Sequence, residues 1–381
     1  MTFPLSVLDL SPVASGSSDA QALRNTLDLA RLADRLGYAR YWLAEHHNIP
    51  SVTSTAPEIM IAHVAMVTSR IRVGSGGIML PNHAPLRIAE SFRVLEALHP
   101  GRIDLGVGRA PGSDSITALA LRRSKEKLGA YDFPEQLEEL ISFGFGRFPE
   151  RHPFASIQAM PKDVPLPPIW ILGSTEDGAR IAADLGVGFA FAHHINPDLA
   201  ESATGVYRDN FKASIWMNRP TTIVAASVVC ADTTEESERL TASLELAWVR
   251  LRTGHPAPLA SPEEALAYPY TPLERDLARA SRRVYFAGNP TIVKKQLDDL
   301  IARTQADELM ITTMVHGHAD RLRSYEPACR QPEYALHVDS IRSPFAMYYK
   351  KRRPQRIRKE DKESPSPNRF QNRKIGSWYS N

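Results

Sequence analysis

Short apolar runs alternate along the chain with longer segments whose apolar residues recur at helical spacing. The short runs are rich in β-branched and aromatic residues, a pattern typical of strands. Eight strands are predicted in this way, at residues 4–9, 39–45, 71–79, 102–108, 167–173, 187–192, 221–229 and 307–314. Helices are predicted between them, at residues 19–36, 57–69, 84–97, 176–185, 197–213, 234–252 and 290–304.

The order of these elements predicts the topology of the sheet. Strands that are apolar over most of their length, each followed by a helix, indicate a parallel sheet buried on both faces. Eight such units predict an α/β fold of the (β/α)8 TIM barrel type. Two long insertions interrupt the repeat, residues 113–166 after the fourth strand and 253–289 after the seventh. Both follow the carboxyl end of a strand, where barrel enzymes carry their substrate-binding loops.

The composition indicates one large globular unit followed by a tail of different character. Of 381 residues, 43% are hydrophobic and 23% charged, which is typical of a soluble globular protein. Residues 327–381 hold 13 Lys or Arg and 5 Asp or Glu, whereas residues 1–326 hold 33 and 38, so the basic character is confined to the tail. We therefore predict a barrel domain over residues 1–326 and a basic, disordered tail, foreign to the barrel, over residues 327–381.

The start of the tail is marked by a proline. Pro327 is expected to end the last helix after about two turns, because proline has no backbone N–H to donate. Downstream, basic blocks and Ser-Pro repeats without a steady period are typical of disordered chain. The run KKRRPQRIRK (350–359) could bind nucleic acid, but a solvated charge run is the simpler interpretation because the body of the chain is acidic.

The sequence also bears on location and on metals. The N-terminus has no basic leader, and no run of about 18 apolar residues occurs, so neither secretion nor membrane insertion is expected. Cys230 and Cys329 lie far apart and outside any CxxC pair. This spacing indicates a reducing cytoplasm and no structural zinc.

The stretch WLAEHHNIPS (42–51) places Glu45, His46 and His47 at the carboxyl end of the second strand. Successive side chains of a strand point to opposite faces, so the two histidines are not expected to bind one metal ion together. Two interpretations remain: histidines packed beneath a loop, or an acid/base group at the catalytic face of the barrel.

A second candidate site lies at two later strand ends. GVGRAPG (106–112) does not have the GxGxxG spacing of a dinucleotide fingerprint, but it places Arg109 just beyond the fourth strand. GSTEDGARIAADLG (173–186) places Ser174 and Thr175 between a strand and a helix. The simpler interpretations are a surface ion pair and an ordinary helix cap. The alternative is a phosphate site, formed by the helix N-terminus and completed by Arg109.

The stretches YWLAEHHN, GSGGIMLPNHAPLRIAESFRVLEALHPGRIDLGVGRAPG and WILGSTEDGARIAADLGVGFAFAHH together resemble the bacterial luciferase-like flavin monooxygenase family. The resemblance extends over about residues 3–326. It implies a cytoplasmic homodimer with a TIM barrel fold. The implied reaction uses reduced FMN, supplied by a separate flavin reductase, and O2 as co-substrate to oxidise a small organic molecule through a flavin C4a-peroxide.

The resemblance assigns roles to particular residues. His46 matches a histidine that acts in proton transfer near the reactive edge of the flavin, and His47 matches its neighbour. Gly76 and Gly77 match a pair of small residues that often form a non-proline cis peptide against the flavin ring. The further cofactor-binding residues expected are Met79, Arg109 for the FMN phosphate, Gly173, Ser174 and Thr175.

The sequence departs from luciferase itself at two positions. Gly108 stands where luciferase has a reactive cysteine, and Gly112 where it has an aromatic residue, so light emission from a long-chain aldehyde is not expected. The chemistry instead predicts a closed apolar pocket and a histidine that titrates near neutrality. The expected pocket residues are Trp42, Ile78, Met79 and Phe191, with His193 and His194 as candidates for its rim.

Two other functions are compatible with this sequence. Relatives on the same barrel use a deazaflavin, so a deazaflavin-dependent dehydrogenase is the first alternative. A non-catalytic flavin-binding protein is the second.

Overall fold

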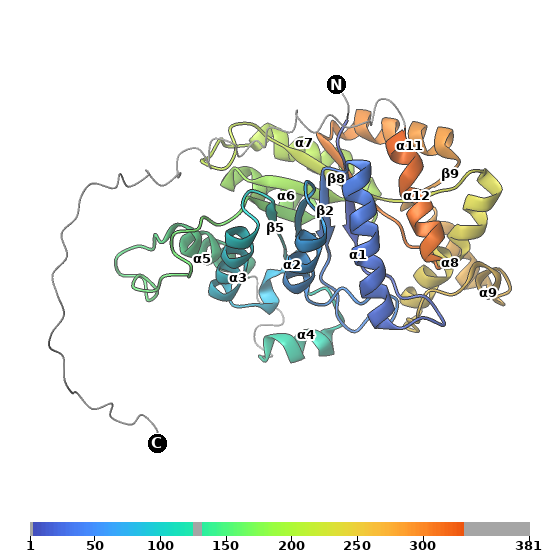
Figure 1. Cartoon of the computed structure of the whole chain (residues 1–381), viewed down its shortest axis with the longest axis horizontal. Helices are drawn as coiled ribbons and strands as arrows, with labels where there is room; N and C mark the ends of the chain where they lie inside the picture. The colour runs from blue at the N-terminus through green and yellow to red at the C-terminus, as the bar shows by residue number, and fades with distance from the viewer. Residues whose placement is uncertain (1–2, 125–131, 331–381) are drawn as a thin grey trace, which may run out of the picture.

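Eight parallel strands close into a barrel in the computed structural model, which describes residues 3–124 and 132–330 (Figure 1). In barrel order they are β1 (Leu5–Asp9), β2 (Arg40–Leu43), β3 (Arg72–Ser75), β5 (Ile103–Gly108), β6 (Ile169–Gly173), β7 (Gly188–Ala192), β8 (Thr222–Cys230) and β10 (Glu308–Thr312). The barrel closes because β10 pairs with both β1 and β8; Leu309 lies opposite Leu5 and Val224. The predicted TIM barrel is confirmed.

Helices surround the sheet in the expected order. They are α1 (Asp19–Leu36), α2 (Pro57–Val67), α3 (Pro85–Leu98), α6 (Glu176–Leu185), α7 (Ala200–Asn210), α8 (Thr234–Arg252), α11 (Pro290–Thr304) and α12 (His318–Arg330). The ends of α1 show how the sequence sets these bounds. The Ser18 side chain accepts a hydrogen bond from the backbone of Gln21, and Gly37 ends the helix in a left-handed conformation. Among the described residues, no helix is long and apolar enough to span a membrane.

The two predicted insertions contain elements of their own. The first holds α4 (Ser115–Arg122) and α5 (Phe133–Phe145). The second holds α9 (Pro262–Leu266), α10 (Pro272–Ser281) and the short strand β9 (Tyr285–Gly288). β9 pairs with the carboxyl-terminal part of β8, where Ser227 lies opposite Tyr285. The second insertion therefore extends the sheet above the barrel mouth.

The strand predicted at residues 71–79 is two strands in the structure, β3 and β4 (Ile78–Met79). The break is the cis peptide bond between Gly76 and Gly77, as the resemblance implied. A Cβ atom on Gly76 would lie 2.5 Å from Leu8 Cδ1, and one on Gly77 would lie 2.8 Å from the Gly106 carbonyl oxygen. Only glycine allows the backbone to pass this close to its neighbours.

Buried charges lie at the amino-terminal end of the barrel. Arg40 Nη1 is 2.8 Å from Asp104 Oδ2, and Arg40 Nε is 3.0 Å from Glu308 Oε2. Arg72 Nη2 is 2.5 Å from Asp104 Oδ1. Burial makes unpaired charges costly, so these residues stabilise the barrel as a mutually paired set. The chemistry is therefore expected at the opposite, carboxyl-terminal end.

The prediction that Pro327 ends the last helix is wrong, since α12 continues to Arg330. A proline removes one intrahelical hydrogen bond, and packing upstream outweighs that loss. Arg321, which is fully buried, lies 2.5 Å from Asp9 Oδ1, and Tyr38 Oη donates to the Tyr325 carbonyl at 2.8 Å. The predicted tail from residue 331 onward lies outside the described residues.

Candidate active site at the carboxyl ends of the strands

The Glu45 carboxylate joins three segments directly after β2. Oε1 lies 2.9 Å from His47 Nε2 and 2.8 Å from His83 Nε2, while Oε2 accepts the backbone N–H of Met79 at 2.8 Å. Burial of Glu45 would raise its pKa, but the hydrogen bonds from His83, His47 and Met79 hold that pKa below its usual value. Conversely, the carboxylate raises the pKa of His83 although burial opposes the charge. Glu45 is thus ionised, and it holds His47, His83 and the Met79 backbone together.

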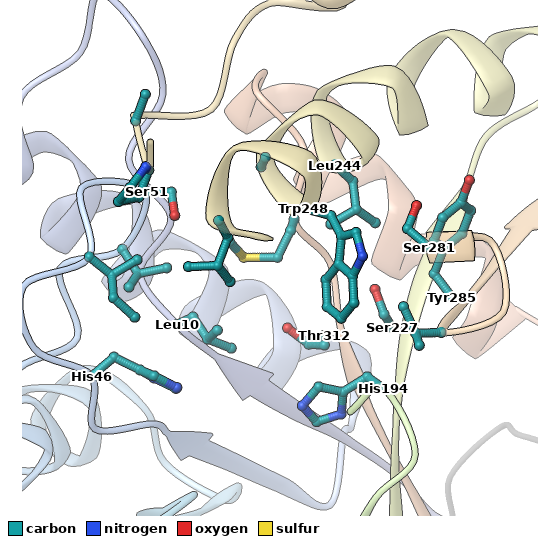
Figure 2. Close-up of a pocket in the computed structure, with 18 residues that line it drawn as sticks. Leu10, His46, Ser51, His194, Ser227, Leu244, Trp248, Ser281, Tyr285 and Thr312 are labelled. Atoms are coloured by element: carbon teal, nitrogen blue, oxygen red, sulfur yellow. The ribbon is translucent and has the colours of Figure 1, made fainter. Parts of the chain in front are cut away.

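His46 points into a cavity (Figure 2). Its backbone N–H donates to Ser54, and within residues 3–124 and 132–330 its buried Nδ1 has no hydrogen-bond partner. Burial, with a further contribution from His194, lowers the pKa of His46 to about 4. The expectation that this histidine titrates near neutrality is therefore wrong, because its ring is too poorly solvated to hold a charge at pH 7.

The two adjacent histidines point in different directions, as predicted, although β2 ends at Leu43 and both lie beyond it. His47 contacts Glu45, whereas His46 faces the cavity. The described part of the chain has no group of three or more His, Cys, Asp or Glu side chains that could hold a metal ion.

The cavity has a volume of about 200 Å³ and lies above the ends of β1, β2, β7, β8 and β10. One wall is an apolar face of α8 formed by Leu244, Ala247, Trp248 and Leu251. In Figure 2, His46 and His194 lie along the floor, with Trp248 above His194. The remaining residues around the cavity are Leu10, Ile49, Ser51, Val52, Ser227, Pro256, Ala257, Ser281, Val284, Tyr285, Thr312 and Met314.

His194 lines this cavity, whereas His193 does not. His194 Nδ1 lies 3.0 Å from the Ala225 carbonyl oxygen, and burial lowers the pKa of His194. The His193 ring is buried against Phe286, with ring centroids 5.3 Å apart.

Three of the four residues expected to form the pocket wall are instead in the core. Trp42, Ile78 and Phe191 are fully buried and do not line the cavity. Trp42 Nε1 donates to Asp104 inside the barrel at 3.2 Å. Met79 also lies off the cavity and contacts the Glu45 cluster through its backbone. A side chain near the end of a strand can point either into the barrel or into the space above it, and these three side chains point into the barrel.

The structure brings Arg109 to the start of α6. Arg109 Nη1 lies 3.7 Å from Asp177 Oδ2, and both side chains are substantially exposed. Thr175 is the N-cap residue of α6, but its side chain makes no capping hydrogen bond. Ser174 is held by its carbonyl oxygen, which accepts from Asn196 at 3.1 Å, and Gly173 ends β6 directly before it. A guanidinium, two hydroxyls and a helix N-terminus therefore lie together, as an anion site requires.

The family follows from comparison with known proteins. A model of the luciferase-like monooxygenase family matches residues 3–322. The chain belongs to this family. It is 40% identical to the luciferase-like monooxygenase of Escherichia coli K12 over 88% of this chain and 98% of that protein. It is 34% identical to the N-acetyl-S-alkylcysteine monooxygenase of Bacillus subtilis over 84% of this chain and 96% of that protein.

Solved structures of known proteins have the same fold as this chain. Apo-MsnO8 is 36% identical, with a TM-score of 0.79 over 88% of this chain and 98% of that chain. Two more distant structures show the fold alone. One is the oxygenating constituent of 3,6-diketocamphane monooxygenase of Pseudomonas putida in complex with FMN (17% identity, TM-score 0.63, 88% and 99% coverage). The other is an F420-dependent secondary alcohol dehydrogenase (10% identity, TM-score 0.63, 87% coverage of this chain and 100% of that chain).

Sequence reasoning missed two parts of this monooxygenase-family site. His83 follows the 3-10 turn Leu80–Asn82 that comes after β4, and a polar ring shortly after an apolar strand was the signal available. The α8 face has the spacing i, i+3, i+4, i+7 of an amphipathic helix, which is the same in a cavity wall and in a packed core. Neither the polar residue His83 nor the apolar face of α8 identifies a site until the fold is known.

Proposed function

We propose that the protein is a monooxygenase that uses reduced FMN and O2 to oxidise a small organic substrate. The observation that carries this proposal is the position of His46, which lines an apolar cavity at the carboxyl ends of the strands and directly follows Glu45, the residue that binds the β4 backbone just beyond Gly76 and Gly77. Membership of the luciferase-like monooxygenase family supports the reaction class.

The residues present fit FMN. Gly76 and Gly77 have no side chains, so a flat ring could approach the side of their backbone that is not packed against Leu8 and Gly106. Arg109, Ser174 and Thr175 would bind the phosphate at the start of α6. Met79 and Gly173 would complete the binding surface from β4 and β6. When bound, reduced FMN would supply the electrons that activate O2.

The side chains of the protein would exclude water and manage protons. Leu244, Trp248 and Leu251 cover the cavity with apolar surface, which protects reactive species from hydrolysis. The neutral His46 ring, whose Nδ1 is unpaired among the described residues, can accept a proton at that atom and return it. Glu45 would hold His47 and the β4 backbone in place beside it.

The electrons would come from a separate flavin reductase, because GVGRAPG (106–112) lacks the spacing of a nicotinamide-binding fingerprint. We expect the enzyme to act as a homodimer, as the resemblance implies. The fold that it shares with an F420-dependent secondary alcohol dehydrogenase makes a deazaflavin the second candidate cofactor.

The experiment is a visible-absorbance titration with FMN and with deazaflavin, followed by turnover under ¹⁸O2 with a flavin reductase. The proposal expects saturable binding of FMN and incorporation of ¹⁸O into the product. Binding of the deazaflavin alone, with substrate oxidised without ¹⁸O, would favour the dehydrogenase. Flavin binding with no oxygen consumption above the reductase background would indicate a non-catalytic flavin-binding protein.

A further inference from the structure

The cavity above the barrel is separate from the residues proposed to hold FMN. None of Gly76, Gly77, Met79, Arg109 or Thr175 lines it, and neither does Gly173 or Ser174. His46 borders the cavity and directly follows Glu45, which contacts the β4 backbone. A molecule in the cavity would therefore meet His46 while leaving the FMN-binding residues free.

The described residues that line the cavity are uncharged. Among them there is no Lys, Arg, Asp or Glu, and the ionisable groups are His46, His194 and Tyr285. Burial lowers the pKa of both histidines and raises that of Tyr285, so all three are neutral at pH 7. Of the groups that act on His46, Glu45 is a carboxylate and offers no positive charge to an anion.

Polar and apolar groups are segregated within the cavity. Ser227 and Thr312 lie opposite each other on the paired strands β8 and β10, next to the His194 floor. The facing wall is the apolar side of α8 around Trp248. A dry apolar cavity of about 150 Å³ holds benzene, so this volume of about 200 Å³ suits a molecule of roughly ten non-hydrogen atoms.

We propose that the substrate is an uncharged, mainly hydrocarbon molecule of this size with one hydrogen-bond acceptor, such as an aliphatic ketone. The acceptor would lie toward the hydroxyl groups of Ser227 and Thr312, and the hydrocarbon toward α8. This proposal deepens the proposed function and rests on it. It also separates this chain from the Bacillus subtilis relative, because an N-acetyl-S-alkylcysteine has a carboxylate and the described residues of this cavity include no cation to pair with it.

The test compares two ligands of similar length and opposite character, methyl hexyl ketone and octanoate, by isothermal titration calorimetry at pH 7. Measurements without flavin come first, so they do not depend on whether FMN is the cofactor. The ketone is expected to bind at least tenfold more tightly than octanoate. Equal affinities, tighter binding of octanoate, or no binding of the ketone would overturn the proposal.

A charge at the rim of the cavity tests where the ligands bind. Leu251 lines the cavity and is 49% exposed, so Leu251→Arg should be tolerated by the fold. It should tighten octanoate binding at least tenfold and change ketone binding by less than threefold. The matched control, Leu273→Arg on α10, is 67% exposed and away from the cavity, and should change neither affinity. Octanoate binding that does not respond to Leu251→Arg would contradict the assigned site.

The outcomes also separate this inference from the proposed function. If the FMN titration fails while the ketone preference and the Leu251→Arg response hold, the cofactor assignment is wrong and the ligand class of the cavity stands. If FMN binds and the ketone does not, only the substrate class is overturned.

Discussion

Arg109 and Asp177 belong to different strand–helix connections, yet Nη1 of Arg109 lies 3.7 Å from Oδ2 of Asp177 at the first turn of α6. The carboxylate occupies one side of the guanidinium that we assign to the FMN phosphate. Both groups are partly solvated, so their interaction is weak and the arginine can be shared with an incoming anion.

We therefore expect Asp177→Asn to strengthen FMN binding about two- to fivefold, because an exposed charge interaction of up to about 1 kcal/mol would be relieved. Fluorescence titration measures the change. Asp184→Asn, at the far end of the same helix and paired with Lys212, is the control and should leave the affinity unchanged. Weaker FMN binding in Asp177→Asn would show that the carboxylate supports the site instead of competing with the phosphate.

His46→Gln should reduce turnover about 10²- to 10⁴-fold while changing FMN affinity by only a few-fold, because glutamine cannot transfer a proton. Steady-state kinetics with reductase-supplied FMN measure the effect. His193→Gln is the control, since that buried ring lies outside the cavity. Turnover of His46→Gln within a few-fold of the wild type would exclude the proposed proton transfer.

The pH dependence gives an independent check on His46. Its pKa in the folded chain, about 4, is lower than the ordinary 6.5, so the unfolded chain binds this proton more readily. The contribution of His46 to stability is therefore complete above about pH 6.5 and falls as the pH drops toward 4. Turnover that depends on the neutral ring should persist to about pH 5. A loss of turnover centred near pH 6.5 that His46→Gln abolishes would contradict the shifted pKa.

Arg40→Met should lower the free energy of unfolding by about 3–5 kcal/mol, because it leaves Asp104 and Glu308 buried with fewer charge partners. Urea denaturation measures the loss. Arg279→Met removes an exposed ion pair with Asp276 and should cost at most about 1 kcal/mol. Similar losses in the two variants would mean that the buried network contributes no more than a surface pair.

A chain ending at Arg330 should keep the melting temperature within a few degrees and the FMN affinity within twofold. The match to the family ends at residue 322, and the contacts that tie α12 to the barrel include those of Arg321, Ser324 and Tyr325, all before residue 331. Thermal unfolding and FMN titration of the truncated and full chains test this prediction. A large loss of either property would show that residues 331–381 belong to the working structure.

Periodicity predicted the barrel because each strand–helix unit repeats the same apolar pattern. It could not predict β9, since four residues within an insertion carry too little pattern to distinguish a strand from a loop. Proline chemistry alone also placed the end of α12 too early, because the packing of Arg321 and Tyr325 cannot be read from local sequence.

The sequence predicted the parts of the candidate site in which a motif fixes where a residue lies along the chain. It did not predict the parts in which side-chain orientation and burial depend on packing. The different directions of His46 and His47 were predicted, although both lie beyond the end of β2, and the order of the strands brought Arg109 to the start of α6. The orientation of Trp42 and the lowered pKa of His46 depend on three-dimensional burial. Neither follows from the neighbouring residues in the chain.

The central claim, that this barrel holds FMN by its phosphate, is tested most directly by the dissociation constants of FMN and riboflavin for the wild type and Arg109→Ala. Loss of charge-assisted hydrogen bonds worth about 1.5–3 kcal/mol should weaken FMN binding roughly ten- to a hundredfold. Riboflavin has no phosphate, so its affinity should be the same for both proteins. Equal weakening of both ligands, or FMN binding that does not respond to Arg109→Ala, would contradict the account.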